Sequence, residues 1–68
     1  MLQTVLFPKK NFTMTEAIVW LHEHKYYAGK VDVGKNYFRF RQHDPTGSQY
    51  YTVTLSNGVE LVYQKSDF

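Results

Sequence analysis

Aromatic and basic residues alternate strictly through the segment NYFRFRQ at residues 36–42. This alternation predicts a β-strand, because successive strand side chains point to opposite faces of a sheet. Phe38 and Phe40 then share one face, and Tyr37, Arg39 and Arg41 share the other. We expect this strand to be central to the fold, with the phenylalanine face buried and the other face available for contact.

A helix is predicted to begin at Thr13, because Thr13 and Glu16 have the spacing of a capping box. Phe12 precedes the cap and is placed to pack on Ala17, one turn into the helix. The helix should end by about Tyr26, before Gly29. Its apolar stripe has helical spacing and should cover a sheet. The stripe consists of Met14, Ala17, Ile18, Trp20, Leu21 and His24.

Four other segments have extended or turn character. Residues 2–7 are short, apolar and rich in strand formers, and Pro8 ends them. Residues 31–35 form a brief extended stretch followed by a bend. A dense turn cluster occupies residues 44–48, and residues 50–55 and 59–64 read as two further strands.

The register of the last hairpin can be derived from burial. With Asn57-Gly58 as a two-residue turn, apolar and polar residues would face each other across the hairpin. With a three-residue loop at 56–58 and a left-handed Gly58, each cross-strand pair on one face is apolar. These pairs are Leu55 with Val59, Val53 with Leu61, and Tyr51 with Tyr63. We therefore predict the bulged three-residue loop.

The predicted fold class is α+β, with one helix packed on a mostly antiparallel sheet of three to four strands in the order β-α-β-β-β. Residues 1–68 form a single domain. In its core, Trp20 and Leu21 should pack across Phe38 and Phe40. Val53 and Leu61 should complete this layer.

Composition agrees with a small globular domain. The chain has 68 residues, of which 43% are hydrophobic and 18% aromatic, and this is ample for a folded core. It contains no Cys, so neither a disulfide nor a thiolate metal site is expected. There is no charged leader and no apolar run long enough for a membrane span, which predicts a soluble protein that is not secreted by a signal of its own. The net charge of +2 is mildly basic and leaves the partner open.

The sequence offers no constellation for catalysis, so no enzymatic activity, cofactor or metal is expected. His22 and His24 are two apart on the predicted helix and point in different directions, and His24 is better explained as a core or edge histidine bonded to backbone. His43 and Asp44 are adjacent in an extended segment and should face opposite ways. No glycine-rich phosphate loop is present.

The candidate contact surface is the face that carries Tyr37, Arg39 and Arg41, with Lys35 just before it. Arginine guanidinium groups suit phosphates, and tyrosine rings suit stacked bases, so this mixture suits nucleic acid. In the alternative interpretation, the arginines lie over aromatic rings or pair with Glu60 and Asp32.

A set of short motifs between Phe12 and Leu61 resembles a domain found in bacteriophage and giant-virus proteins. The motifs are EA-x-x-WL at 16–21, KVD at 30–32 and N-Y-x-RFRQ at 36–42, of which RFRQ is the most specific. The resemblance implies a viral origin. In phages such domains resemble segments that accompany capsid or prohead-protease modules, which implies a role in assembly.

Two functional hypotheses follow. In the first, the chain is a small non-enzymatic viral binding module whose Tyr37, Arg39 and Arg41 face contacts nucleic acid. In the second, it is a protein-interaction module that acts as a virion or capsid-assembly component or as an inhibitor of a host defence protein, and a free strand edge would permit dimerisation. Either function places it in the host cytoplasm or in the virion.

Overall fold

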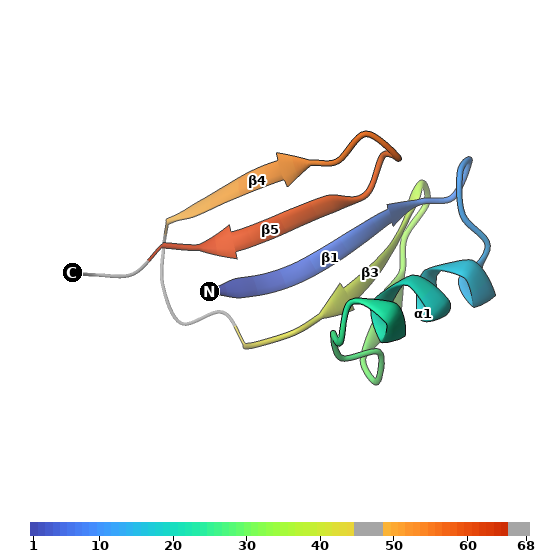
Figure 1. Cartoon of the computed structure of the whole chain (residues 1–68). Helices are drawn as coiled ribbons and strands as arrows, with labels where there is room; N and C mark the ends of the chain where they lie inside the picture. Colours follow the sequence, from blue (N-terminus) through green and yellow to red (C-terminus); the bar gives the residue numbers. More distant parts are fainter. Residues whose placement is uncertain (45–48, 66–68) are drawn as a thin grey trace.

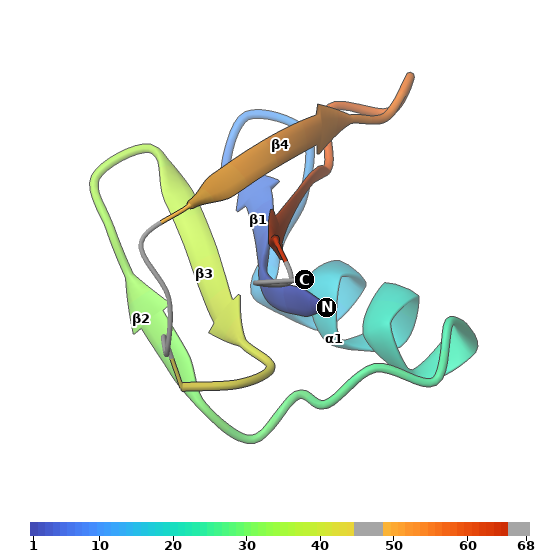
Figure 2. The ribbon, with the colours of Figure 1, turned by 90° about the vertical axis from the view of Figure 1, so that its left-hand side faces the viewer.

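The structure is a computed structural model that describes residues 1–44 and 49–65. In these residues the chain forms one α-helix and one antiparallel sheet of five strands, in the spatial order β2-β3-β1-β5-β4. Figure 1 shows β3, β1, β5 and β4 side by side, and β2 is labelled in Figure 2. The elements, in chain order, are β1 (Leu2–Pro8), α1 (Met14–Glu23), β2 (Val31–Val33), β3 (Tyr37–Arg41), β4 (Tyr50–Thr54) and β5 (Glu60–Gln64). The α+β class is confirmed.

The strand count and the central strand differ from the sequence-based prediction. The sheet has five strands rather than three or four, because residues 31–33 form the edge strand β2 and pair with β3. The middle position belongs to β1, which pairs with β3 on one side and β5 on the other. β1 contains no charged residue and can therefore be covered on both faces, as the burial of Thr4 and Val5 illustrates.

Helix α1 begins where the capping box predicts. The Thr13 hydroxyl accepts a hydrogen bond from the Glu16 amide at 3.1 Å, and the Glu16 carboxylate accepts one from the Thr13 amide at 2.9 Å. Ala17 and Leu21 are fully buried, whereas Val19 and Glu23 point to solvent. The helix lies on one side of the sheet (Figure 2).

The helix ends earlier than Tyr26, at a Schellman motif built without glycine. Lys25 adopts the left-handed conformation with φ of 60°. The Lys25 amide donates to the His22 carbonyl at 3.1 Å, and the Tyr26 amide donates to the Leu21 carbonyl at 2.8 Å. These two bonds satisfy carbonyl groups that the end of a helix leaves without partners.

The core is aromatic and centres on Phe7. The Phe7 ring makes edge-on contacts with Phe12 at 5.2 Å, and with Trp20 and Phe40 at 5.6 Å each. Its fully or nearly buried apolar members are Val5, Phe7, Ala17, Leu21, Phe40, Val59 and Leu61.

The predicted core layer is therefore correct for Leu21, Phe40 and Leu61 and wrong for Val53, which is 40% exposed. Trp20 and Phe38 are only half-buried. Every residue of β4 is exposed, so the ten-residue helix leaves this strand uncovered. The sheet is wider than the surface that one short helix can bury.

The register of the last hairpin is confirmed. Tyr51 faces Tyr63 and Val53 faces Leu61, and the Leu55 amide donates to the Val59 carbonyl at 2.8 Å. Gly58 has φ of +92°. This left-handed conformation favours glycine, and a Cβ atom at Gly58 would in addition lie 2.7 Å from the side-chain nitrogen of Asn11, which would have to shift.

Candidate nucleic-acid interface

The two faces of β3 differ as the alternation predicts. Phe40 is fully buried and Phe38 packs against the core, whereas Tyr37 and Arg39 are exposed and Arg41 is partly exposed. We call the side of the sheet opposite α1 the open face. Cross-strand pairing places on it Leu6, Asp32, Tyr37, Arg39, Arg41, Glu60 and Val62.

Two adjoining hollows occupy the open face. One, of about 560 Å³, is lined by residues of β1 and β5 and by the β2–β3 hairpin from Asp32 to Tyr37. The other, of about 340 Å³, includes Arg41, Tyr50 and Val62. Leu6 and Arg39 line both hollows, so Arg39 stands at the boundary between them. The open face therefore carries two hollows that adjoin each other at Leu6 and Arg39.

Arg39 is available for an external partner. In the part of the chain that the structure describes, its side chain makes no ion pair and no hydrogen bond, although Asp32 is its register partner on β2. Nor does it lie over an aromatic ring of a described residue. The alternative in which Arg39 is occupied by Asp32, Glu60 or an aromatic side chain is thus wrong.

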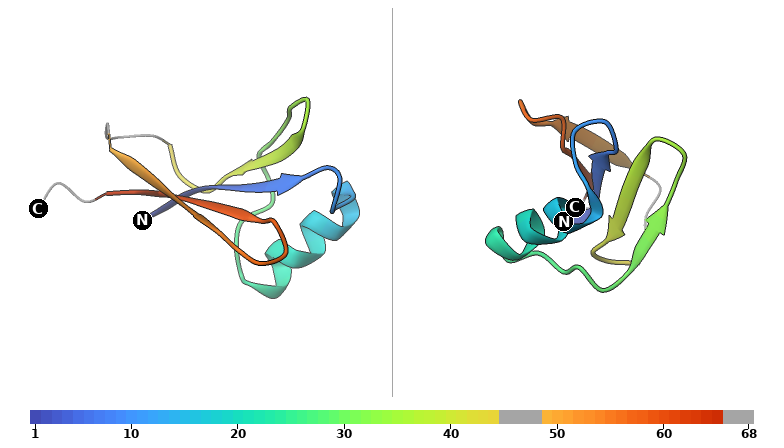
Figure 3. Two further views of the ribbon diagram at one scale, coloured as in Figure 1. Left: turned by 90° about the horizontal axis from the view of Figure 1, so that it is seen from above. Right: turned by 90° about the vertical axis from the view of Figure 1, so that its right-hand side faces the viewer.

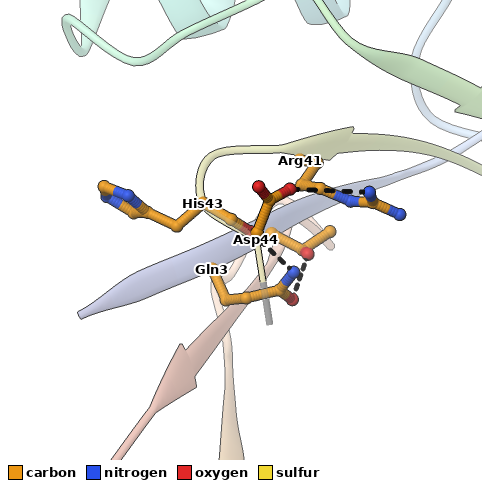
Figure 4. Close-up of polar contacts among 5 residues, drawn as sticks. Gln3, Arg41, His43 and Asp44 are labelled. Atoms are coloured by element: carbon orange, nitrogen blue, oxygen red, sulfur yellow. Dashed lines mark hydrogen bonds and ion pairs between the residues drawn. The ribbon is translucent and has the colours of Figure 1, made fainter. Parts of the chain in front are cut away.

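Arg41 has a weak partner of its own. Its Nη1 atom lies 3.9 Å from an Asp44 carboxylate oxygen, and both side chains are substantially exposed (Figure 4). An exposed pair at this distance contributes little stability and exchanges readily for another anion. The same view shows the His43 imidazole pointing away from Arg41 and Asp44, while the His43 carbonyl accepts a 3.0 Å hydrogen bond from the side-chain Nε2 of Gln3. His43 and Asp44 therefore do not act on a common point.

Tyr37 interacts with Glu60, which lies across β1. A hydrogen bond to Glu60 on β5, together with the negative charge of Glu60, raises the pKa of the Tyr37 hydroxyl above its ordinary value. The neighbour of Tyr37 on β1 is Pro8, and β1 lies between β3 and β5. Tyr37 lies at the end of the open face that is next to the β2–β3 turn.

A lysine cluster lies beside Tyr37 and was missed by sequence reasoning. The Lys9 amide donates to the Asn36 carbonyl at 2.9 Å, which joins the end of β1 to the β2–β3 turn. As a result Lys9, Lys10 and Lys35 line one hollow of about 350 Å³ together with Tyr37. Only Lys35 was expected at the site, because the other two lysines are distant in sequence.

Two more residues, Gln42 and Tyr50, contribute to the region of the candidate site and were not among the predicted site residues. The Gln42 side chain accepts a 2.8 Å hydrogen bond from the Tyr27 amide and donates a 2.7 Å bond to the Tyr27 carbonyl, so it ties the segment after α1 to β3. Tyr50 brings a second aromatic ring to the open face. The position of Tyr50 could have been derived from the predicted hairpin register. Tyr51 and Tyr63 face the helix side of the sheet in that register, so the adjacent Tyr50 faces the open side.

The histidines of the helix have local contacts. His24 is exposed, its Nδ1 atom lies 2.8 Å from the Trp20 carbonyl, and its ring stacks on Trp20 at 3.7 Å. The predicted backbone hydrogen bond of His24 is confirmed, whereas its predicted place on the buried stripe of the helix is wrong, because His24 is the exposed residue that follows the last turn of α1. Residues 1–44 and 49–65 contain no group of three or more His, Asp or Glu side chains arranged to hold a metal ion.

Comparison with known proteins gives no relative: no protein-family model, curated protein or solved structure matches this chain. Among the described residues, no helix has the length and apolar character needed to cross a membrane.

Proposed function

We propose that the chain is a small viral, non-enzymatic module that binds single-stranded nucleic acid on its open face. The observation that carries the proposal is the exposed side chain of Arg39, which has no ion pair among the described residues and lines two adjoining hollows. A planar fork of N–H donors without an internal partner is suited to a phosphate group.

Basic groups continue in both directions from Arg39. Side chains two residues apart in a strand are about 6.8 Å apart, so Arg39 and Arg41 contact successive points on an extended backbone. The lysine cluster of Lys9, Lys10 and Lys35 lies beyond Tyr37. The Lys9 Nζ atom lies 5.4 Å from the centre of the Phe38 ring. The other basic side chains, Arg39, Arg41, Lys10 and Lys35, still outnumber the acidic Asp32, Glu60 and Asp44, which gives this surface a positive field in a chain of net charge only +2.

The aromatic rings supply contacts for bases. Tyr37 and Tyr50 lie toward opposite ends of the open face, with Arg39 between them. Stacking on an aromatic ring accepts any base, so the site should bind single strands with little sequence preference. A duplex cannot offer its base faces to these rings, and we expect it to bind more weakly.

Fluorescence anisotropy with short single-stranded DNA and RNA tests the proposal. The logarithm of the affinity should fall linearly with the logarithm of the salt concentration. The double substitution of Arg39→Ala and Arg41→Ala removes two phosphate contacts, and each lost contact should make this slope shallower by roughly 0.7 for a single strand. Lys65→Ala is the matched control, because Lys65 follows β5 and lines none of the hollows described here. Absence of binding at low salt, or an equal loss with the control variant, contradicts the proposal.

A second candidate function is a protein-interaction module within the virion. It is favoured by a different observation: several large apolar side chains are exposed, including Val33 at 61% and Tyr51 at 46%. Exposed aromatic and aliphatic groups of this kind are typical of contact surfaces. Recovery of the chain with capsid protein from nuclease-treated particles would support this function, and its absence from particles would count against it.

A further inference from the structure

The two edge strands of the sheet, β2 and β4, differ in how well they are protected against pairing with a strand of another chain. β2 has only three residues, carries the charged Asp32 at its middle and is flanked by Lys30 and Lys35. β4 has five residues, TyrTyrThrValThr at 50–54, and no residue from 49 to 59 is charged. Its register with β5 is continuous, without a bulge. β4 therefore lacks the short length, charges, prolines and bulges that normally prevent edge-to-edge pairing.

The outer edge of β4 has defined hydrogen-bonding positions. The Leu55 amide donates to the Val59 carbonyl at 2.8 Å, and the Lys65 amide donates to the Gln49 carbonyl at 3.0 Å. Because bonding direction alternates along an antiparallel strand, Tyr51 and Val53 also bond toward β5, and Thr52 and Thr54 direct their N–H and C=O groups outward. No described strand pairs with this outer side (Figures 1 and 3).

We propose that β4 pairs antiparallel with β4 of a second copy of this chain, centred on Thr52. In this register Thr52 faces its own counterpart, and Val53 faces Tyr51 of the second copy. Aromatic and β-branched residues are favourable cross-strand partners, as are pairs of threonines. Since Tyr51 already stacks on Tyr63 at 5.3 Å and Val53 faces Leu61, one apolar row would run across both copies.

A second copy is the occupant that the residues fit best. The strand is uncharged, so two copies meet without repulsion, and it offers nothing to attract a partner of opposite charge. Its pattern is self-complementary about Thr52, which is the requirement of a two-fold interface. The axis of such a pairing is perpendicular to the sheet, so both open faces lie on the same side. If the proposed nucleic-acid site is correct, the dimer presents two such sites to one strand.

The oligomeric state can be measured without nucleic acid, which separates this test from that of the proposed function. Sedimentation equilibrium from about 10 µM to about 1 mM covers the range of a weak interface. We expect the mass to rise from 8.1 kDa toward twice that value. Thr52→Pro removes an outward N–H and keeps the ladder to β5, so it should leave a folded monomer. A wild-type chain that stays monomeric at about 1 mM overturns the proposal, as does a Thr52→Pro variant that is folded and still dimeric.

The register has its own test, because the chain contains no cysteine. Facing residues of a hydrogen-bonded pair have Cα atoms about 5.5 Å apart, within the range that a disulfide spans. Thr52→Cys should therefore form a covalent dimer on mild oxidation. Val53→Cys is the matched control, because its counterpart would lie about two residues away along the partner strand, beyond disulfide reach. Equal cross-linking of the two variants, or more in Val53→Cys, contradicts the Thr52-centred pairing.

Discussion

At the scale of single residues, Lys25 is the clearest case of a residue type that does not favour its own backbone conformation, which is left-handed. It is the one residue other than glycine with positive φ in the described part of the chain. The conformation is held by the two backbone hydrogen bonds that end α1 and by the packing of Tyr26 beside Trp20, with ring centroids 6.1 Å apart. The tertiary contacts of Tyr26 thus compensate for a residue that does not favour its own conformation.

Lys25→Gly should therefore stabilise the protein. Glycine has no steric penalty at this φ, and the gain should be about 1 kcal/mol in the free energy of unfolding, after its greater flexibility in the unfolded chain is included. Chemical denaturation measures the change. Lys25→Ala controls for loss of the charge and should give no comparable gain in stability. If Lys25→Gly is instead less stable than the wild type, the contacts of the Lys25 side chain stabilise the fold by more than the left-handed backbone destabilises it.

Tyr37 should titrate above an ordinary tyrosine, since Glu60 raises its pKa in the folded protein. A group with a raised folded pKa contributes stability at pH values below about 10, the unfolded value, and loses that contribution as pH rises through the folded pKa. Glu60→Gln should bring the Tyr37 pKa back toward its usual range. NMR titration of the tyrosine ring carbons measures both values, and an unchanged Tyr37 pKa in Glu60→Gln would contradict the contact.

At the scale of the element, successive side chains of β3 point alternately to the core and to the open face, so that core residues and candidate site residues follow each other along one strand. Phe40→Ala should cost about 3–5 kcal/mol of unfolding free energy, as expected for a buried large aromatic residue. Arg39→Ala should change it by less than about 0.5 kcal/mol, because the side chain is exposed and makes no contact that the fold requires. Thermal melts of the two variants compare these effects directly, and a large loss for Arg39→Ala would mean that the open face is part of the core.

Local signals predict the elements better than they predict how the elements pair. The capping box at Thr13 and the bulged loop at Gly58 depend on residues a few positions apart, and both are present as predicted. The central place of β1 depends on pairing with β3 and β5, which lie far away in sequence and leave no periodic signal in residues 2–8.

The same distinction applies to the candidate site. Tyr37, Arg39 and Arg41 share a face because strand geometry requires it, so alternation was sufficient to group them. Lys9 and Lys10 join Lys35 only through the contact between the end of β1 and the β2–β3 turn. No spacing along the chain encodes that contact.

At the scale of the whole molecule, stability should depend on one aromatic centre. Phe7 is fully buried and contacts rings from the helix cap, the helix and β3. A small domain without disulfides has about 5 kcal/mol of stability, so Phe7→Ala, at about 3–5 kcal/mol, should leave much of the protein unfolded at 25 °C. Trp20→Ala should cost less, because Trp20 is only half-buried. Circular dichroism of both variants measures the unfolded fraction, and the reverse order would place the centre of the core at Trp20.

The most direct measurement of function is an NMR titration of the wild-type chain with a short single-stranded oligonucleotide. Binding on the open face should shift the side-chain signals of Arg39 and Arg41 and the ring signals of Tyr37, while Val19 and Glu23 on the outer side of α1 stay unchanged. Shifts confined to the helix, or none at low salt, would contradict a nucleic-acid site on the open face of the sheet.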